Sequence, residues 1–329
     1  MKIRFDLTEE HPTLIQKIET WFVGGSVNGV MSEKVTWNAF VHLPNDIKLA
    51  FSGDLPYKGM PEIWDAEKYV KRTVINMFKS SLEEAFDQKK RNIMRVITIG
   101  DIHGSTLWKD VKVDEYDKVI FMGDYTDHWT YTDQHILKNL SEIIVLKEIN
   151  TDKVVLLLGN HDLQYMFGGR LHSCSGFRPQ MQPTLYELFT EKKDLFQAAY
   201  YYKAEKGTEW LWTHAGVSAP WYATRFMHVI EKMGIENENL GDQLNLAFES
   251  YMKELFDVGY ERYGNHPNGG PFWADRSETQ HDPLPNINQI IGHTKLKAIQ
   301  CFGVPMNSAT VTYVDVLEGD NPDFLTLDL

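Results

Sequence analysis

Five short segments of this sequence carry side chains that could bind metal ions. They read GDIHG at 100–104, GDYTD at 123–127, GNHD at 159–162, HAG at 214–216 and GHT at 292–294. The side chains of carboxylate, imidazole and amide type in these segments are Asp101, His103, Asp124, Asn160, His214 and His293. Such a set, without a thiolate, suits Mn, Fe, Zn or a similar first-row ion. Two adjacent divalent ions are a general device for displacing groups at phosphorus, and this set is large enough to hold two.

Each segment follows an apolar run, at 95–100, 118–122, 153–158, 210–213 and 289–291. Continuous apolar runs of this length predict strands that are buried on both faces. The polar side chains would then lie on strand-to-loop junctions along one edge of the core, where the glycines allow tight turns. One Gly-Asp-X-His-Gly alone could be a turn with a capping aspartate, but five such junctions favour a metal site. One carboxylate usually bridges a metal pair, and Asp124 is the best candidate.

These motifs resemble those of the calcineurin-like metallophosphoesterases, and most closely the phosphoprotein phosphatase branch with its bacterial and phage enzymes. That branch carries GDxHG, GDxxDRG, GNHE, HGG or HAG, and a late GH, and the resemblance covers about residues 94–315. It implies an α/β sandwich of two mixed sheets flanked by helices. It implies a first metal held by Asp101, His103 and Asp124, and a second held by Asp124, Asn160, His214 and His293. Manganese is the expected metal, with Fe, Zn, Ni, Co or Mg as alternatives.

The resemblance also assigns His161 as the general acid that protonates the leaving oxygen, with Asp127 orienting its ring. The assignment agrees with the chemistry, because a leaving alkoxide needs a proton and an imidazole can supply one near neutral pH. The alternative for His161 is a structural histidine behind the ligands.

Two departures from the branch pattern concern the phosphate. His128 stands where the branch has an arginine, and a neutral imidazole lacks the planar, permanently charged fork of a guanidinium. Either His128 binds phosphate when protonated, or another residue supplies the charge. Arg276, in the segment PFWADR, is the leading candidate clamp, with a surface ion pair as its alternative; Arg170 and Arg178 are weaker candidates. Asp162 replaces a glutamate, which is a milder change.

The late GHT motif helps to choose between branches. Nuclease-like relatives often have a second ligand histidine two residues after the first, and this chain has Lys295 there. The phosphatase branch is therefore favoured, with three protein ligands on the first metal.

The composition agrees with a globular enzyme of 329 residues, with 43% apolar and 24% charged residues. A formal net charge of −13 argues against nonspecific nucleic-acid binding. The N-terminal residues lack the apolar core of a signal peptide, and no apolar run approaches membrane-spanning length. Cys174 and Cys301 lack metal-ligand spacing, so we expect a reduced, cytoplasmic protein, with a disulfide between them as the alternative.

The chain divides into an N-terminal extension or cap of unknown role at 1–92 and a catalytic domain at 93–329. A helix is expected over 64–90, helical structure over 221–256, and turns over 259–271. The loop at 163–183 should border the site, and segments 309–316 and 324–327 should each close a sheet.

The expected reaction is metal-dependent hydrolysis of a phosphomonoester, in the manner of a serine/threonine protein phosphatase. A dinucleoside polyphosphate, a nucleotide and an RNA end remain alternative substrates, because substrate choice lies in loops that one sequence does not resolve. An alternative of another class is an inactive binding module that keeps the fold. The sequence does not determine the oligomeric state.

Overall fold

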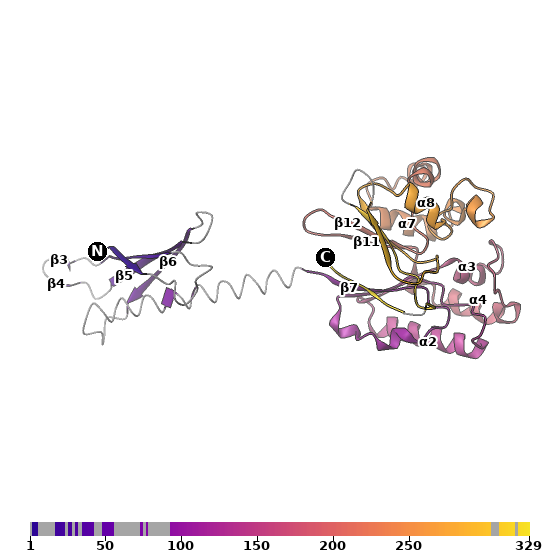
Figure 1. The fold of residues 1–329 in the computed structure, drawn as a ribbon, viewed down its shortest axis with the longest axis horizontal. Helices are drawn as coiled ribbons and strands as arrows, with labels where there is room; N and C mark the ends of the chain where they lie inside the picture. The colour runs from indigo at the N-terminus through magenta and orange to yellow at the C-terminus, as the bar shows by residue number, and fades with distance from the viewer. Residues whose placement is uncertain are drawn as a thin grey trace. The chain divides into compact units, whose positions relative to one another are not determined.

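The structure is a computed structural model that describes residues 2–5, 17–23, 26–27, 30–31, 35–42, 48–55, 73–74, 77, 93–303, 309–319 and 322–329. Contacts within the chain separate it into two compact units, Met1–Asn92 and Ile93–Leu329. Figure 1 shows both units as ribbons.

The described strands of the first unit form antiparallel sheets. The strands β1 (Lys2–Phe5), β2 (Lys17–Val23), β5 (Val35–His42) and β6 (Lys48–Leu55) lie in the order β1-β2-β5-β6, and β3 (Ser26–Val27) pairs with β4 (Val30–Met31). Most of the helix expected over 64–90 lies outside the described residues. The three described residues within this range, 73, 74 and 77, are helical. The function of this unit as a cap stays a prediction.

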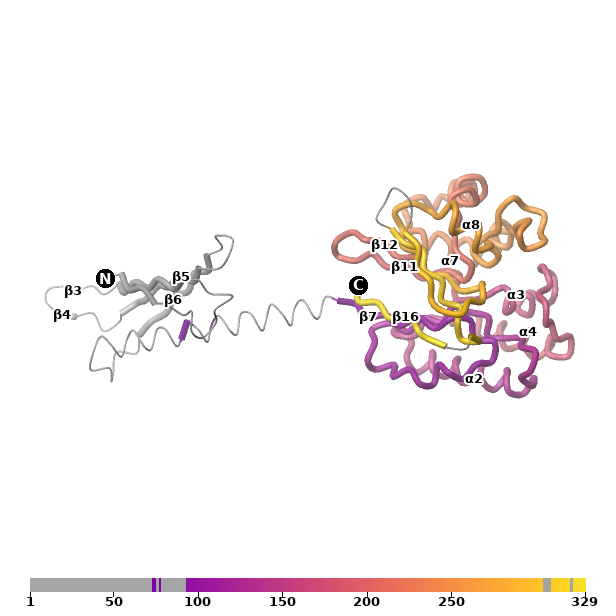
Figure 2. The backbone as a smooth tube through the Cα atoms, viewed as in Figure 1, coloured from indigo at the N-terminus to yellow at the C-terminus, as the bar shows by residue number. Residues whose placement is uncertain are grey.

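The second unit contains two five-stranded mixed sheets, as predicted. In the first, β7 (Arg95–Ile99), β8 (Lys118–Phe121), β9 (Val154–Leu157) and β10 (Phe196–Gln197) are parallel, and β16 (Leu325–Asp328) is antiparallel to β7. In the second, β12 (Glu209–Thr213), β13 (Ile287–Ile291) and β15 (Thr310–Tyr313) are parallel, and β11 (Ala199–Lys203) and β14 (Gln300–Gly303) form antiparallel edges. The two predicted C-terminal segments thus each add a strand to a sheet, and Figure 2 shows β16 beside β7.

The apolar runs are buried on both faces because the first sheet packs between the second sheet and a helix. On one face, Val96 belongs to a buried cluster with Trp212 and Ile290 of the second sheet. On the other face, Ile97 packs in a cluster with Ile136 of α2 (Asp133–Ile149). Successive side chains of a strand point to opposite faces, which explains why most positions of these runs are apolar. Buried Thr98 is an exception, and its hydroxyl accepts a hydrogen bond from Trp212 Nε1 at 2.9 Å.

Helices cover the outer faces of the two sheets (Figure 1). Besides α2, the described helices of this unit are α3 (Asn160–Met166), α4 (Gln182–Glu191), α5 (Ala219–Trp221), α6 (Met227–Met233), α7 (Leu240–Glu249) and α8 (Arg276–His281). A π-helical turn lies at Tyr222–Phe226. Short 3₁₀ turns occur at Leu107–Asp110, Val113–Glu115, Pro179–Met181, Lys193–Leu195, Lys253–Phe256 and Tyr260–Arg262. The helical structure expected over 221–256 is present and is interrupted at Gly234, which adopts the left-handed conformation at the end of α6.

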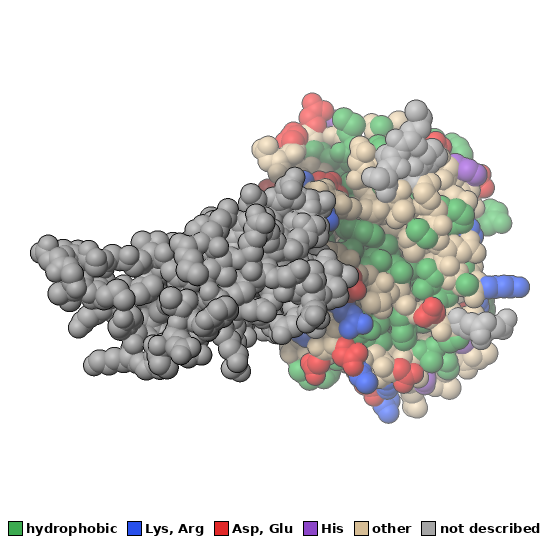
Figure 3. Space-filling view, turned by 60° about the vertical axis from the view of Figure 1, so that its left-hand side comes forward, with side chains coloured by type: hydrophobic (Ala, Val, Ile, Leu, Met, Phe, Trp, Pro, Cys, Tyr) green, Lys and Arg blue, Asp and Glu red, His purple; other side chains and the backbone are tan. Residues whose placement is uncertain are grey.

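The surface of the second unit carries charges of both signs. On the face drawn in Figure 3, acidic and basic side chains are interspersed with apolar ones. None of the helices in the described ranges has both the length and the apolar character needed to cross a bilayer.

Candidate active site

The predicted ligands gather where parallel strands end. Asp101 follows β7, Asp124 follows β8, Asn160 opens α3 after β9, His214 follows β12 and His293 follows β13. The carboxyl ends of neighbouring parallel strands meet at one edge of a sheet, and ligand sites of open α/β sheets lie there. The fold therefore gathers side chains that are up to 192 residues apart in sequence, as between Asp101 and His293.

The backbone at this edge is held in conformations that most residues avoid. His103, Asp124, Asp127 and His293 have φ angles of 39°, 50°, 58° and 63°, in the left-handed region. Such conformations cost on the order of 1–3 kcal/mol each and concentrate at functional sites. Gly159 and Gly292 make room for the carboxylates, because a Cβ at these positions would lie 2.0 Å from Asp124 Oδ1 and 2.2 Å from Asp101 Oδ1.

One group of ligand atoms comes from Asp124, Asn160, His214 and His293. His214 Nε2 lies 2.9 Å from Asn160 Oδ1, 3.1 Å from His293 Nδ1 and 3.4 Å from Asp124 Oδ2, and Asn160 Oδ1 lies 3.0 Å from His293 Nδ1. His214 Nδ1 lies 2.8 Å from the carbonyl oxygen of Met122 and must carry the proton there, so Nε2 of the neutral ring is a bare lone pair. Nitrogen and oxygen atoms of these four side chains thus lie close together at one place.

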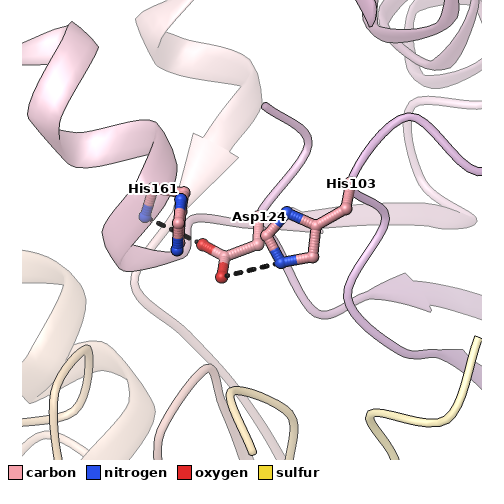
Figure 4. A group of neighbouring side chains, drawn as sticks. All are labelled: His103, Asp124 and His161. Atoms are coloured by element: carbon pink, nitrogen blue, oxygen red, sulfur yellow. Dashed lines mark hydrogen bonds and ion pairs between the residues drawn. The ribbon is translucent and has the colours of Figure 1, made fainter. Parts of the chain in front are cut away.

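A second group consists of His103, Asp124 and His161. Figure 4 shows the carboxylate of Asp124 between the imidazoles of His103 and His161. His103 Nδ1 lies 2.9 Å from the carbonyl oxygens of both Thr126 and Asp127, so its bare Nε2 faces Asp124 Oδ2 at 3.6 Å. The ligand atoms of His103, Asp124 and His161 lie within 4.8 Å of one another, as do those of Asp124, His214 and His293. Asp124 therefore belongs to both groups.

Asp101 stands beside these groups and belongs to neither. Both of its oxygens lie within hydrogen-bonding distance of the backbone N–H of His293, at 2.9 and 3.1 Å. The resemblance placed Asp101 on the first metal together with His103 and Asp124, whereas the structure places His161 with that pair. The assignment of Asp101 as a ligand stays a prediction.

The buried charges of the site fit divalent cations. Burial and the neighbouring carboxylates of Asp315 and Asp124 raise the pKa of Asp101 well above its usual range, and burial and Asp124 raise that of Asp162 to about 7. Burial would likewise raise the pKa of Asp124, but His214, His161 and His103 lower it well below its usual range. Buried carboxylates this close are costly unless a cation compensates them.

The spacing of the ligand atoms around His214 also fits an ion. Two ligand atoms that each lie about 2.1 Å from an ion, at right angles to one another, are about 3.0 Å apart. The distances between the ligand atoms of His214, Asn160 and His293 are 2.9 to 3.1 Å.

His161 is held by a carboxylate, as the resemblance implied. His161 Nδ1 lies 2.9 Å from Asp127 Oδ2, and Asp127 also accepts hydrogen bonds from Gln164 Nε2 at 2.6 Å and from the hydroxyl of Tyr165. Asp127 is buried and its side chain is fixed by these donors. The imidazole edge that carries Nε2 is therefore available to the hollow that His161 lines.

Asp162 supports the turn that carries Asp124. Its Oδ1 accepts from the backbone N–H groups of Tyr125 at 2.9 Å and Thr126 at 3.3 Å, and its Oδ2 accepts from Gly159 N at 3.0 Å. We expect Asp162→Ala to lower the free energy of unfolding by about 3 kcal/mol, because several buried donors lose their acceptor. Urea denaturation measures this, with Asp110→Ala, an exposed aspartate, as the control. Equal midpoints for the two variants would contradict the role of Asp162.

Two hollows open on this edge. The larger, of about 370 Å³, is lined by ligands of both groups and by Arg262, Lys295, Asp315 and Glu318. The smaller, of about 160 Å³, shares His103, His161 and Glu318 with it and extends past His128 and Trp129. Ser173, Cys174 and Ser175 line the larger hollow, so the loop at 163–183 borders the site as expected.

The prediction that Arg276 clamps phosphate is not supported, because its side chain is used elsewhere. Arg276 opens α8, donates to Gln300 Oε1 at 2.7 Å and lies over the rings of Phe302 and Tyr313. It does not line either hollow. Arg178 binds Asp133 and the carbonyl oxygens of 128 and 131, so it organises the loop after Asp127.

His128 lines the smaller hollow but has no free ring nitrogen. Nδ1 accepts from the backbone N–H groups of Thr130 at 3.1 Å and Tyr131 at 3.2 Å, and Nε2 lies 3.1 Å from Glu318 Oε1. Burial lowers the pKa of His128 in spite of Glu318. The ring is therefore neutral near pH 7 and committed to these partners, so of the two alternatives the geometry favours a phosphate-binding charge from another residue.

The sequence reasoning missed the four residues with acidic or basic side chains, other than histidine and Asp124, that line the larger hollow: Arg262, Lys295, Asp315 and Glu318. Asp315 follows β15, which is parallel to β13, so it lies at the same edge as the predicted ligands. Burial and nearby carboxylates raise its pKa to about 6. The segment around 309–316 was expected only to close a sheet, although its aspartate at a strand end was the same signal as at Asp101 and Asp124. For Arg262, Lys295 and Glu318 the motifs held no signal.

Two ligand groups that share one carboxylate, beside a histidine held by an aspartate, are suited to hydrolysis at phosphorus with the help of metal ions. The family model for calcineurin-like phosphoesterases matches residues 94–299, more than half of the sequence, and the chain belongs to this family.

Other comparisons add little to this assignment. No curated protein matches the sequence. Among solved structures, the chain is similar to a protein serine/threonine phosphatase from Saccharomyces cerevisiae, itself described as similar to human phosphatase PP5. The identity is 14%, the match covers 72% of this chain and 79% of the yeast chain, and the TM-score is 0.40. The family assignment rests on the sequence match and not on this likeness.

Proposed function

We propose that this protein hydrolyses a phosphomonoester at two divalent metal ions that share Asp124. The observation that carries the proposal is the position of Asp124 in two ligand groups at once. In this proposal His103, Asp124 and Asp101 hold the first ion, and Asp124, Asn160, His214 and His293 hold the second.

The residues around the ligands then have separate tasks. Bound divalent ions would polarise the phosphoryl group and activate water at neutral pH. His161 gives a proton from Nε2 to the oxygen of the leaving alcohol, and Asp127 keeps the ring in the orientation that this transfer needs. Gln164 and Tyr165 keep Asp127 in place.

For the substrate we propose a phosphorylated serine or threonine of a protein. The smaller hollow continues from His161 past His128 and Trp129. This space supports a leaving group that is larger than a simple alcohol, such as a serine or threonine within a peptide. A dinucleoside polyphosphate is the second candidate, favoured by two exposed aromatic residues at the hollows, Trp129 at 80% and Tyr263 at 95% exposure. Such rings can stack on bases. We propose manganese as the metal and the cytoplasm as the location.

Metal removal tests the proposal. Dialysis against a chelator is expected to abolish turnover of p-nitrophenyl phosphate, because the buried carboxylates then lack their cations, and added Mn²⁺ should restore it with two ions per chain. Elemental analysis and steady-state rates measure both, with Fe²⁺, Zn²⁺, Ni²⁺, Co²⁺ and Mg²⁺ for comparison. Metal binding without any turnover would instead indicate an inactive binding module.

A substrate panel separates the two candidate substrates. Phosphoserine and phosphothreonine peptides should have a higher kcat/KM than diadenosine tetraphosphate or 5′-phosphorylated RNA. A preference for the dinucleotide that disappears in Trp129→Ala would favour the second candidate.

A further inference from the structure

A phosphate dianion in the larger hollow needs a permanent positive charge. The resembling phosphatase branch has an arginine at the position of His128, and the ring of His128 is neutral. Among the arginines of residues 93–303, Arg262 alone lines the hollow that contains the ligand groups. We infer that Arg262 binds the oxygens of the transferred phosphoryl group, in place of an arginine at position 128. This inference rests on the proposed function and names the residue that holds its substrate.

The loop that carries Arg262 is closed on itself, so it can place a charge accurately. Gly264 N donates to Gly259 O at 2.9 Å, and Tyr260 N donates to His266 O at 2.9 Å. Gly264 is required for this closure, because a Cβ there would lie 2.0 Å from the carbonyl oxygen of Val258. Tyr263, the residue after Arg262, has a φ angle of 62°, a conformation that tyrosine rarely adopts.

The guanidinium of Arg262 is anchored on one edge and open on the other. Nε pairs with Asp275 Oδ2 at 2.8 Å, and Nη2 donates to Thr294 Oγ1 at 2.7 Å. Thr294 directly follows the ligand His293, so the guanidinium is tied to the second ligand group. Within the described part of the chain Nη1 has no hydrogen-bond partner. A planar donor fork with a free nitrogen beside the ligands is suited to a phosphoryl oxygen.

Asp275 is the positioning residue for this arginine. Its Oδ1 accepts from the backbone N–H and the hydroxyl of Ser277, at 2.9 and 2.8 Å, as the N-cap of α8. Its Oδ2 is thereby directed at Arg262. The segment PFWADR does serve the site in this proposal, but through Asp275 and not through Arg276.

Lys295 is the other cation that lines the larger hollow, and it is less suited to the task. Its side chain is 58% exposed and its ammonium pairs with Glu318 Oε2 at 2.6 Å. A flexible ammonium also lacks the fixed geometry of the guanidinium. Glu318 in turn contacts His128, so Lys295 and His128 share one carboxylate at the boundary of the two hollows.

The test measures binding of inorganic phosphate to the manganese-loaded protein by calorimetry, together with KM for p-nitrophenyl phosphate. We expect Arg262→Ala to weaken phosphate binding and to raise KM about 10- to 100-fold, because a charge-assisted hydrogen bond is lost. Arg262→Lys should recover part of this loss, and Asp275→Asn should cause a smaller one. Methylguanidinium added to Arg262→Ala should improve phosphate binding.

The matched control is Arg276→Ala, which removes an arginine outside both hollows and should leave phosphate binding and KM within about twofold of the unsubstituted protein. Unchanged phosphate affinity in Arg262→Ala with two metals bound would overturn the inference, and so would a loss confined to Lys295→Ala. Phosphate binding does not depend on turnover. An inactive protein whose phosphate affinity still falls in Arg262→Ala would therefore refute the proposed function and leave the inference standing.

Discussion

Asp124→Asn is expected to lose one or both metal ions and to reduce kcat/KM roughly 10³-fold or more, which corresponds to about 4 kcal/mol of transition-state stabilisation. The reason is that Asp124 is the one side chain common to the two ligand groups found among the described residues. An amide of the same size presents one neutral oxygen where the carboxylate presents two charged ones. The change therefore weakens both groups at once.

A readout independent of activity is the thermal midpoint with and without Mn²⁺. Ions that bind the folded state raise this midpoint, so the rise should be large in the unsubstituted protein and small in Asp124→Asn. Asp114→Asn, at an exposed position away from the ligands, is the control. Two tightly held ions in Asp124→Asn would show that Asp124 does not bridge them.

The sequence predicted the strands that matter for this site. The runs before Asp101, Asp124 and Asn160 became β7, β8 and β9, each ending within three residues of the predicted ligand. This succeeds because burial on both faces favours apolar side chains at successive positions, which leaves a clear local pattern in the sequence. Polar residues directly after such runs then fall at the edge of the sheet without any knowledge of the tertiary structure.

The side chain that we propose to bind phosphate could not be predicted in the same way. Arg276 lies three residues after Trp273, at a position that a motif comparison favours, but its direction depends on how α8 begins. Asp275 caps that helix, which turns the next side chain toward Phe302 and Tyr313. Arg262 lies in a turn-rich segment without a motif, and only the closure of that loop brings it to His293 and Thr294.

The position of Asp101 illustrates a different limit. Its residue type and its place after β7 predict a ligand, and in the structure both of its oxygens also lie within hydrogen-bonding distance of the backbone N–H of His293. A carboxylate that stabilises a ligand's backbone and one that binds the ion itself have the same signature in a sequence. The left-handed backbone of His293, with a φ angle of 63°, brings that N–H to Asp101 and is a property of the folded chain alone.

His161→Ala is expected to keep both metal ions and to lower kcat about 10²- to 10⁴-fold on a phosphoserine peptide. The leaving alkoxide of serine is strongly basic and needs a proton as the bond to phosphorus breaks. The nitrophenolate of p-nitrophenyl phosphate needs little protonation, so the loss on that substrate should be much smaller. Steady-state rates on the two substrates and metal analysis of the same preparation measure the effect.

Asp127→Asn provides the matched variant, because it leaves the imidazole but removes the carboxylate 2.9 Å from His161 Nδ1. Its loss should show the same dependence on the leaving group and should be smaller than that of His161→Ala. The double variant should lose little more than His161→Ala alone, since residues that act as a unit are not additive. His161 also lies within ligand distance of His103 and Asp124. Loss of an ion from His161→Ala, with equal loss of rate on both substrates, would therefore make His161 a ligand and not the acid.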